Sequence, residues 1–103
     1  GCIIINKEFA ENNPEFVDEF LKQYENSVNW VLENQKEASV LTAKHEIMPD
    51  AVLVEKALPY CGITFRKAAE AKESLNNFYQ ILFDSNPASV GGSMPDDEFY
   101  FKE

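Results

Sequence analysis

The chain offers few side chains of the types that enzymes use for catalysis. Its single histidine is His45, and the nearest acid, Glu46, is adjacent in sequence, so the two cannot share one face of a helix. Serines and carboxylates are plentiful, but no Gly-x-Ser-x-Gly segment is present to expose a nucleophile. The residues therefore predict a protein that is not an enzyme, with His45 on its surface.

Two short segments contain residue types that bind metal ions or phosphate elsewhere. Asp96-Asp97-Glu98 is acidic, but neighbouring acids rarely converge on one cation, and the spaced ligands of a calcium loop are missing. Gly91-Gly92 is not followed by the lysine and the helix of a phosphate-binding loop. We expect no metal ion and no cofactor, and we interpret the acidic segment as a solvated turn.

The two cysteines, Cys2 and Cys61, fit neither the spacing of a zinc site nor a Cys-x-x-Cys redox motif. Two interpretations stay open. Both side chains are buried free thiols, or, in an oxidising compartment, a disulfide joins Cys2 to Cys61 and closes a long loop.

Charge and size narrow the classes of partner. The chain has 103 residues with 18 acidic against 9 basic side chains, a formal net charge of −9. Such a surface repels phosphate backbones and anionic lipids, so we expect no nucleic acid and no membrane surface as partner. The 45% apolar content is that of a globular protein, and the length suits a single domain over residues 1–103 with a thin core.

Two segments predict strands. Cys2 to Ile5 is apolar and mostly β-branched without alternation, a pattern typical of a strand buried on both faces. One strand cannot form a sheet, so its hydrogen-bonding partners must lie elsewhere in the fold or in another chain. Tyr60 to Phe65 reads as extended chain or a second short strand, which Gly62 weakens.

Helical spacing of apolar residues dominates the rest of the chain. Lys7 to Glu11 predicts one turn of helix with Phe9 pointing inward. A long helix should begin at Pro14, with Asn13 as its cap, and end near residues 33–34. Its apolar stripe comprises Phe16, Val17, Phe20, Leu21, Tyr24, Val28, Val31 and Leu32.

Three further helices are predicted, over residues 35–46, 51–58 and 69–84, the second of them stopped by Pro59. The last has the stripe Ala71, Leu75, Phe78, Tyr79 and Leu82. The tail beyond it is rich in glycine and proline, yet it finishes on the aromatic residues 99–101. Because disordered tails rarely carry such a cluster, we expect these residues to pack onto a surface.

Several short motifs, each weakly specific, occur in an order that resembles the nitrate/sulfonate/taurine-type solute-binding proteins of ABC importers. Residues 1–21 contain the apolar segment, a Lys-Glu-Phe-Ala turn and an Asn-Pro-Glu helix start. Residues 58–65, Leu-Pro-Tyr-Cys-Gly-Ile-Thr-Phe, resemble the Ile-Pro-x-Cys-Asn-Ile segment of a subgroup, with Gly62 in place of its asparagine. Residues 91–100 resemble its closing Gly-Gly-x-x-Pro-Asp-x-x-Phe-Tyr.

The resemblance implies an α/β fold, mainly helical with one or two short strands, as part of one lobe of a type II periplasmic binding protein. The chain would be the carboxy-terminal segment of a two-lobed extracytoplasmic protein, periplasmic or lipid-anchored at the outer face of the cytoplasmic membrane. That protein would capture a small-molecule solute and deliver it to an ABC transporter permease. Gly1 and Cys2 would lie near the hinge, and Tyr60 and Thr64 near the ligand cleft.

A stand-alone helical module for protein–protein interaction is the alternative function, because four amphipathic helices can close a small bundle without a sheet. Under the first interpretation, we expect the isolated chain to form a dimer or to be marginally stable. The strand edge and the uncovered helix stripes would otherwise face water.

Overall fold

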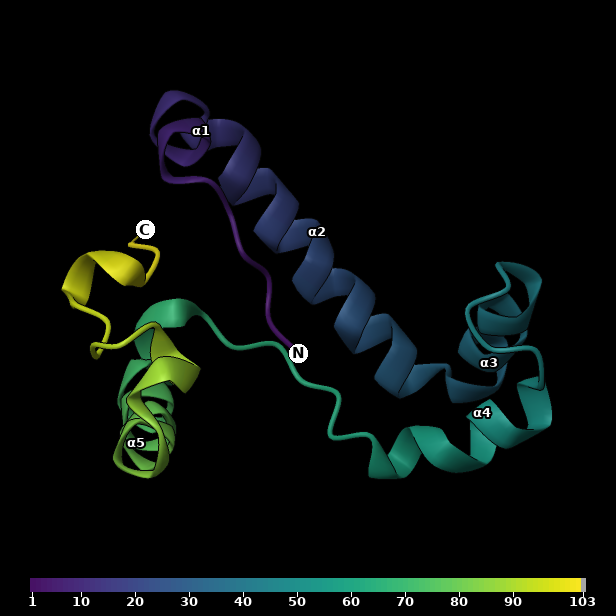
Figure 1. Ribbon diagram of the computed structural model, residues 1–103. Helices are drawn as coiled ribbons and strands as arrows, with labels where there is room; N and C mark the ends of the chain where they lie inside the picture. Colours follow the sequence, from purple (N-terminus) through teal and green to yellow (C-terminus); the bar gives the residue numbers. More distant parts are fainter. Residues whose placement is uncertain (103) are drawn as a thin grey trace. The chain divides into compact units, whose positions relative to one another are not determined.

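The computed structural model describes residues 1–102 as helices joined by irregular segments (Figure 1). The chain divides into two compact units, Gly1–Phe65 and Arg66–Glu103, which we call the amino-terminal and carboxy-terminal units. Each unit is built around one long helix, so each is described by itself below.

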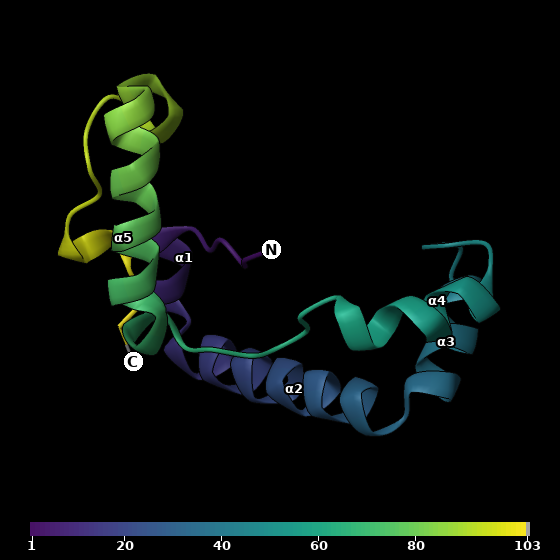
Figure 2. The same ribbon diagram turned by 90° about the horizontal axis from the view of Figure 1, so that it is seen from below.

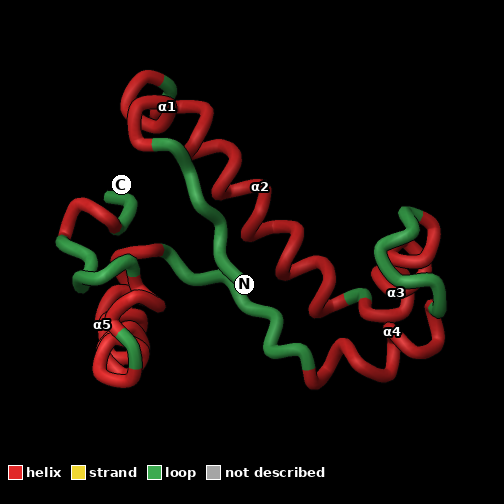
Figure 3. Tube along the Cα trace, in the orientation of Figure 1, coloured by secondary structure: helices red, strands yellow, loops and turns green. Residues whose placement is uncertain are grey.

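The predicted α/β fold class is wrong, and with it the assignment to a lobe of a type II periplasmic binding protein. No strand occurs in residues 1–102 (Figure 3). The segment Cys2 to Ile5 is irregular, and Ile4 is 90% exposed. An apolar, β-branched run favours extended backbone, but a strand exists only where a second backbone takes up its N–H and C=O groups. The described chain offers no such neighbour.

The second predicted strand is also absent. Leu58–Tyr60 forms a turn of 3₁₀ helix, η1, and the chain then continues without regular structure as far as residue 67. Gly62 has φ of 61°, in the left-handed region that glycine adopts without steric cost and that a β-strand does not use. The glycine that weakened the strand prediction is therefore the residue at which the chain turns.

The amino-terminal unit contains α1 (Lys7–Asn12), α2 (Pro14–Glu33), α3 (Gln35–Lys44), α4 (Ala51–Ala57) and η1. The predicted bounds of α2 are confirmed, with Pro14 as its first residue, where a missing N–H costs no hydrogen bond. The α4 helix ends at Ala57, and the chain tightens into η1 around Pro59. A proline nitrogen cannot donate to the carbonyl one turn back, which ends the α-helical hydrogen bonding.

Two asparagines divide the first part of the chain into separate helices. Asn13, expected to cap the start of α2, makes no side-chain cap there; its Nδ2 instead donates to the carbonyl of Phe9 at 2.9 Å and closes α1. Asn34 repeats the arrangement, with its Nδ2 donating to the carbonyl of Trp30 at 2.9 Å at the end of α2. The backbone N–H of each asparagine donates to the same carbonyl, at 3.0 Å for Asn13 and 2.9 Å for Asn34, so this residue bonds the carbonyl twice where the helix ends.

Helices α3 and α4 pack side by side at the end of the unit (Figures 1 and 2). The turn between them passes through Glu46, which has φ of 56°. Asp50 then starts α4, because its Oδ1 accepts hydrogen bonds from the N–H groups of Val52 at 3.0 Å and Leu53 at 3.1 Å.

The buried core is thin, as the length of the chain predicts. The buried hydrophobic residues are Ala10, Val17, Val28, Ala38 and Tyr100. Ser39 is buried as well, and its hydroxyl donates to the carbonyl of Lys36 at 2.6 Å, so no polar group is left unpaired there. Phe9, expected to point inward, is 43% exposed.

The carboxy-terminal unit consists of α5 (Ala68–Ser85) and the segment 86–102, which we call the strap. The strap contains two 3₁₀ turns, η2 (Pro87–Val90) and η3 (Asp97–Phe99). Gly91 and Gly92 have φ of 81° and 89°, and the Gly92 N–H donates to the carbonyl of Pro87 at 2.8 Å. This left-handed pair reverses the chain, and the strap returns along α5 toward the start of the helix (Figure 2).

Candidate docking surface

A row of aromatic side chains lies exposed along α2. Phe16, Phe20 and Tyr24 recur every four residues and so share one face of the helix. Their exposed fractions are 61%, 42% and 41%. At its two ends the row meets Phe9, which contacts the Phe16 ring edge-on at 5.7 Å, and Phe65, whose ring centroid is 6.1 Å from that of Tyr24. We call these five residues the aromatic row; all lie in the amino-terminal unit.

Three residues of the aromatic row, Phe16, Phe20 and Tyr24, belong to the apolar stripe of α2 that the sequence predicted to be inward. On the neighbouring side of α2, Val17 is 2% exposed and Val28 is 8% exposed. Trp30, six residues beyond Tyr24, is also exposed, at 41%. The apolar face of α2 is therefore wider than the cover that the described part of this unit provides.

Acidic side chains line the rest of α2. The helix carries a single lysine, Lys22. Its five carboxylates are Glu15, Asp18, Glu19, Glu25 and Glu33. Glu19 accepts a hydrogen bond from the neutral amide of Gln23 at 2.7 Å rather than from a cation. An open hollow at the junction of α1 and α2 is lined by Asn12, Asn13, Pro14, Glu15 and Phe16. At 100° per residue, Glu19 flanks the aromatic row, and the other four carboxylates lie toward the opposite side of α2.

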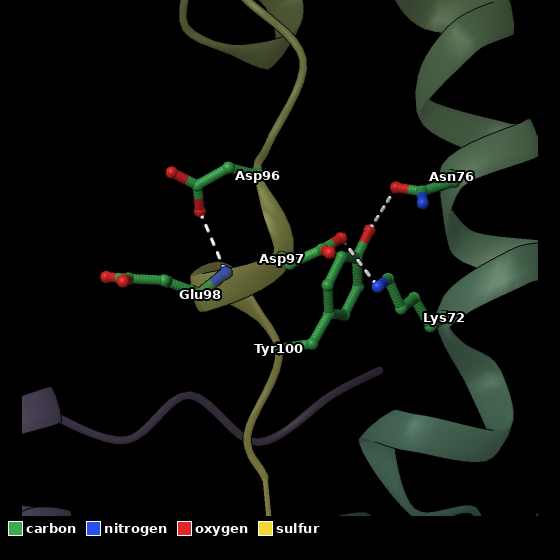
Figure 4. Close-up of polar contacts among 6 residues, drawn as sticks. All are labelled: Lys72, Asn76, Asp96, Asp97, Glu98 and Tyr100. Atoms are coloured by element: carbon green, nitrogen blue, oxygen red, sulfur yellow. Dashed lines mark hydrogen bonds and ion pairs between the residues drawn. The ribbon is translucent and has the colours of Figure 1, made fainter.

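The most connected polar cluster holds the strap to α5 (Figure 4). Lys72 Nζ lies 2.6 Å from Asp97 Oδ1, and the Tyr100 hydroxyl donates to Asn76 Oδ1 at 2.5 Å. The same ammonium lies 5.8 Å from the centre of the Tyr100 ring, within range of a cation–π attraction. One turn further along α5, Phe99 contacts the Tyr79 ring edge-on at 6.2 Å. These contacts fix the strap against one face of the helix.

The electrostatics of this cluster follow from its contacts. The hydrogen bond from Lys72, and then its positive charge, hold the pKa of Asp97 below its ordinary value of 3.8. Burial raises the pKa of Tyr100 above its ordinary value of 10.0, because the phenolate would lose its hydration. Each polar group already has its partner within the cluster, so the arrangement suits anchoring rather than the binding of a substrate.

The acidic segment predicted as a solvated turn is the η3 turn of the strap. Asp96 Oδ1 accepts the N–H of Glu98 at 3.0 Å, which starts the turn and leaves Asp97 directed at Lys72 (Figure 4). Across residues 1–102, no three histidine, cysteine or acidic side chains gather closely enough to hold a metal ion.

The structure places the four predicted hinge and cleft residues on the surface of the amino-terminal unit. Gly1, Cys2, Tyr60 and Thr64 are all exposed, Tyr60 at 89%. No hydrogen bond joins any two of them in the described chain, so ligand binding by these residues stays a prediction. Cys2 and Cys61 are free thiols, and both are exposed rather than buried; the Cys61 thiol donates to the carbonyl of Ala57 at 3.3 Å. The alternative Cys2–Cys61 disulfide stays a prediction.

The packing predicted for the aromatic residues of the tail is confirmed for Tyr100, whereas Phe99 is 62% exposed. Tyr100 is 5% exposed, and Phe99 contacts both Tyr100 and Tyr79. The surface that receives them is supplied by α5 of the same chain. Sequence reasoning missed the exposure of the aromatic row, because aromatic residues at helical spacing are usually core. The signal that pointed to it was the width of the stripe on α2.

Comparison with known proteins adds no relative. No family model, no curated protein and no solved structure matches the chain. Among residues 1–102, no helix combines the length and apolar character needed to cross a membrane.

Proposed function

We propose that this chain is the carboxy-terminal part of the solute-binding protein of an ABC importer, and that it is not an enzyme. Its contribution to solute capture is structural: the aromatic row packs against the remainder of that protein. The observation that carries the proposal is the row itself, in which Phe16, Phe20 and Tyr24 stand between 41% and 61% exposed on a helix that buries Val17 and Val28. Aromatic side chains with this exposure are typical of surfaces that a second polypeptide covers.

The order of the motifs supports a solute-binding protein as the polypeptide whose remainder covers the aromatic row. In the segment Gly91 to Tyr100, which resembles the closing motif of that family, four of the matching residues have a defined structural role. The glycines reverse the chain at φ of 81° and 89°, Asp96 starts η3, and Tyr100 anchors the strap. These roles are the support that this motif gives to the proposed resemblance.

A helical protein–protein interaction module is the second candidate. The absence of a strand in residues 1–102 favours it, because the resemblance implied one or two strands. In this reading the aromatic row binds a separate protein.

A solute-binding measurement distinguishes the solute-binding protein from the interaction module. We expect that the product of the complete reading frame containing this chain binds a small anionic or heterocyclic solute, such as a sulfonate, nitrate or a pyrimidine precursor, in isothermal titration calorimetry. The isolated 103-residue chain should bind none of them. A reading frame that encodes this chain alone, or a longer product that binds no solute of these classes, would contradict the solute-binding proposal and leave the interaction module in its place.

A substitution in the aromatic row provides a second test of the two proposed functions. In a solute-binding protein, Phe20→Ser in the complete product lowers its melting temperature, because the row is part of its interior. In an interaction module the same change leaves the melting temperature unchanged and removes partner binding. Val52→Ser is the matched control, since Val52 is 62% exposed and lies on α4.

A further inference from the structure

We draw no further inference here: the strongest candidate, the row of exposed aromatic side chains at Phe16, Phe20 and Tyr24 along α2, carries nothing beyond the function proposed above, because nothing in the structure shows which surface covers it.

Discussion

The two long helices, α2 and α5, differ in how the chain that follows each of them packs against it. Both α2 and α5 are amphipathic, and both present more apolar surface than a single helix can hide. After α5 the glycine pair at Gly91 and Gly92 turns the chain, so that the strap returns and buries Tyr100 against the helix. After α2, Asn34 leads directly into α3, and the row from Phe16 to Tyr24 stays exposed.

This difference indicates which contacts each unit depends on. The carboxy-terminal unit depends on contacts within its own chain, so removing those contacts should destabilise it locally. The open face of α2 contributes little to the stability of the isolated chain, so changes there should alter binding more than folding. The changes below probe this contrast, from the largest expected effect to the smallest.

Tyr100→Ala should cause the largest loss. It removes a buried ring and its hydrogen bond to Asn76, and truncation of a buried aromatic costs about 3 kcal/mol. We expect the backbone amides of the strap and α5 to lose protection in hydrogen exchange measured by mass spectrometry, while those of α2 keep theirs. Phe99→Ala, at a 62% exposed position, is the control and should cost far less. Equal losses for the two variants would mean that Tyr100 is no anchor.

Neighbouring residues on α2 should differ sharply in their effect. Val17→Ala removes two methyl groups from a side chain that is 2% exposed and should lower the free energy of unfolding by about 2 kcal/mol. Phe16→Ala, at 61% exposed, should change it by no more than about 0.5 kcal/mol. Urea unfolding followed by Trp30 fluorescence measures both. A large loss for Phe16→Ala would show that the row is already covered in the isolated chain.

Gly91→Ala tests the turn that creates the strap. Gly91 has φ of 81°, and no atom lies within 4 Å of the position that an added Cβ would take, so the cost comes from the backbone alone. An L-residue in this region costs about 1 kcal/mol. The change should raise amide exchange in the strap. Gly1→Ala, which also meets nothing within 4 Å, should leave exchange unaltered.

The smallest expected effect is that of pH on the strap. The pKa of Asp97 is lowered from 3.8 by Lys72, so the folded state binds this proton less readily than the unfolded state. The stabilisation is present above pH 3.8 and is lost as the pH falls through the lower folded value. It should be small because Asp97 is exposed. At pH 5 the strap amides of the wild type should exchange more slowly than those of Asp97→Asn. Below pH 3.8 the two sets of exchange rates should converge. A difference that stays the same at both pH values would mean that the Lys72–Asp97 pair is not the cause.

At high pH the same strap should loosen through Tyr100. Burial raises its pKa above 10.0, so the stabilisation is present below that value and is lost as the pH rises through the higher folded pKa. The phenolate also loses the proton that the hydroxyl donates to Asn76. Tyr100→Phe should remove this alkaline dependence, and its persistence in that variant would assign it to another group.

Local signals in the sequence were sufficient for the helices. Pro14 and the apolar spacing after it gave the bounds of α2, and the spacing after residue 68 gave α5 to within one residue at each end. Local signals also pointed to a packed tail, because aromatic residues such as Tyr100 rarely end a disordered segment. Each of these features depends on a few neighbouring residues, which is why composition and spacing reveal them.

The strand at Cys2 to Ile5 and the direction of the aromatic row could not be settled in the same way. Whether an apolar run becomes a strand depends on a second backbone, and whether a helix face is buried depends on what packs against it. The amino-acid sequence was sufficient to locate the ends of α2 and α5 and to indicate a thin core and an acidic surface. The tertiary structure was needed to show that the strap packs Tyr100 onto α5, and that Phe16, Phe20 and Tyr24 on α2 and Phe78 and Ile81 on α5 stay exposed, because burial is a property of contacts between distant residues.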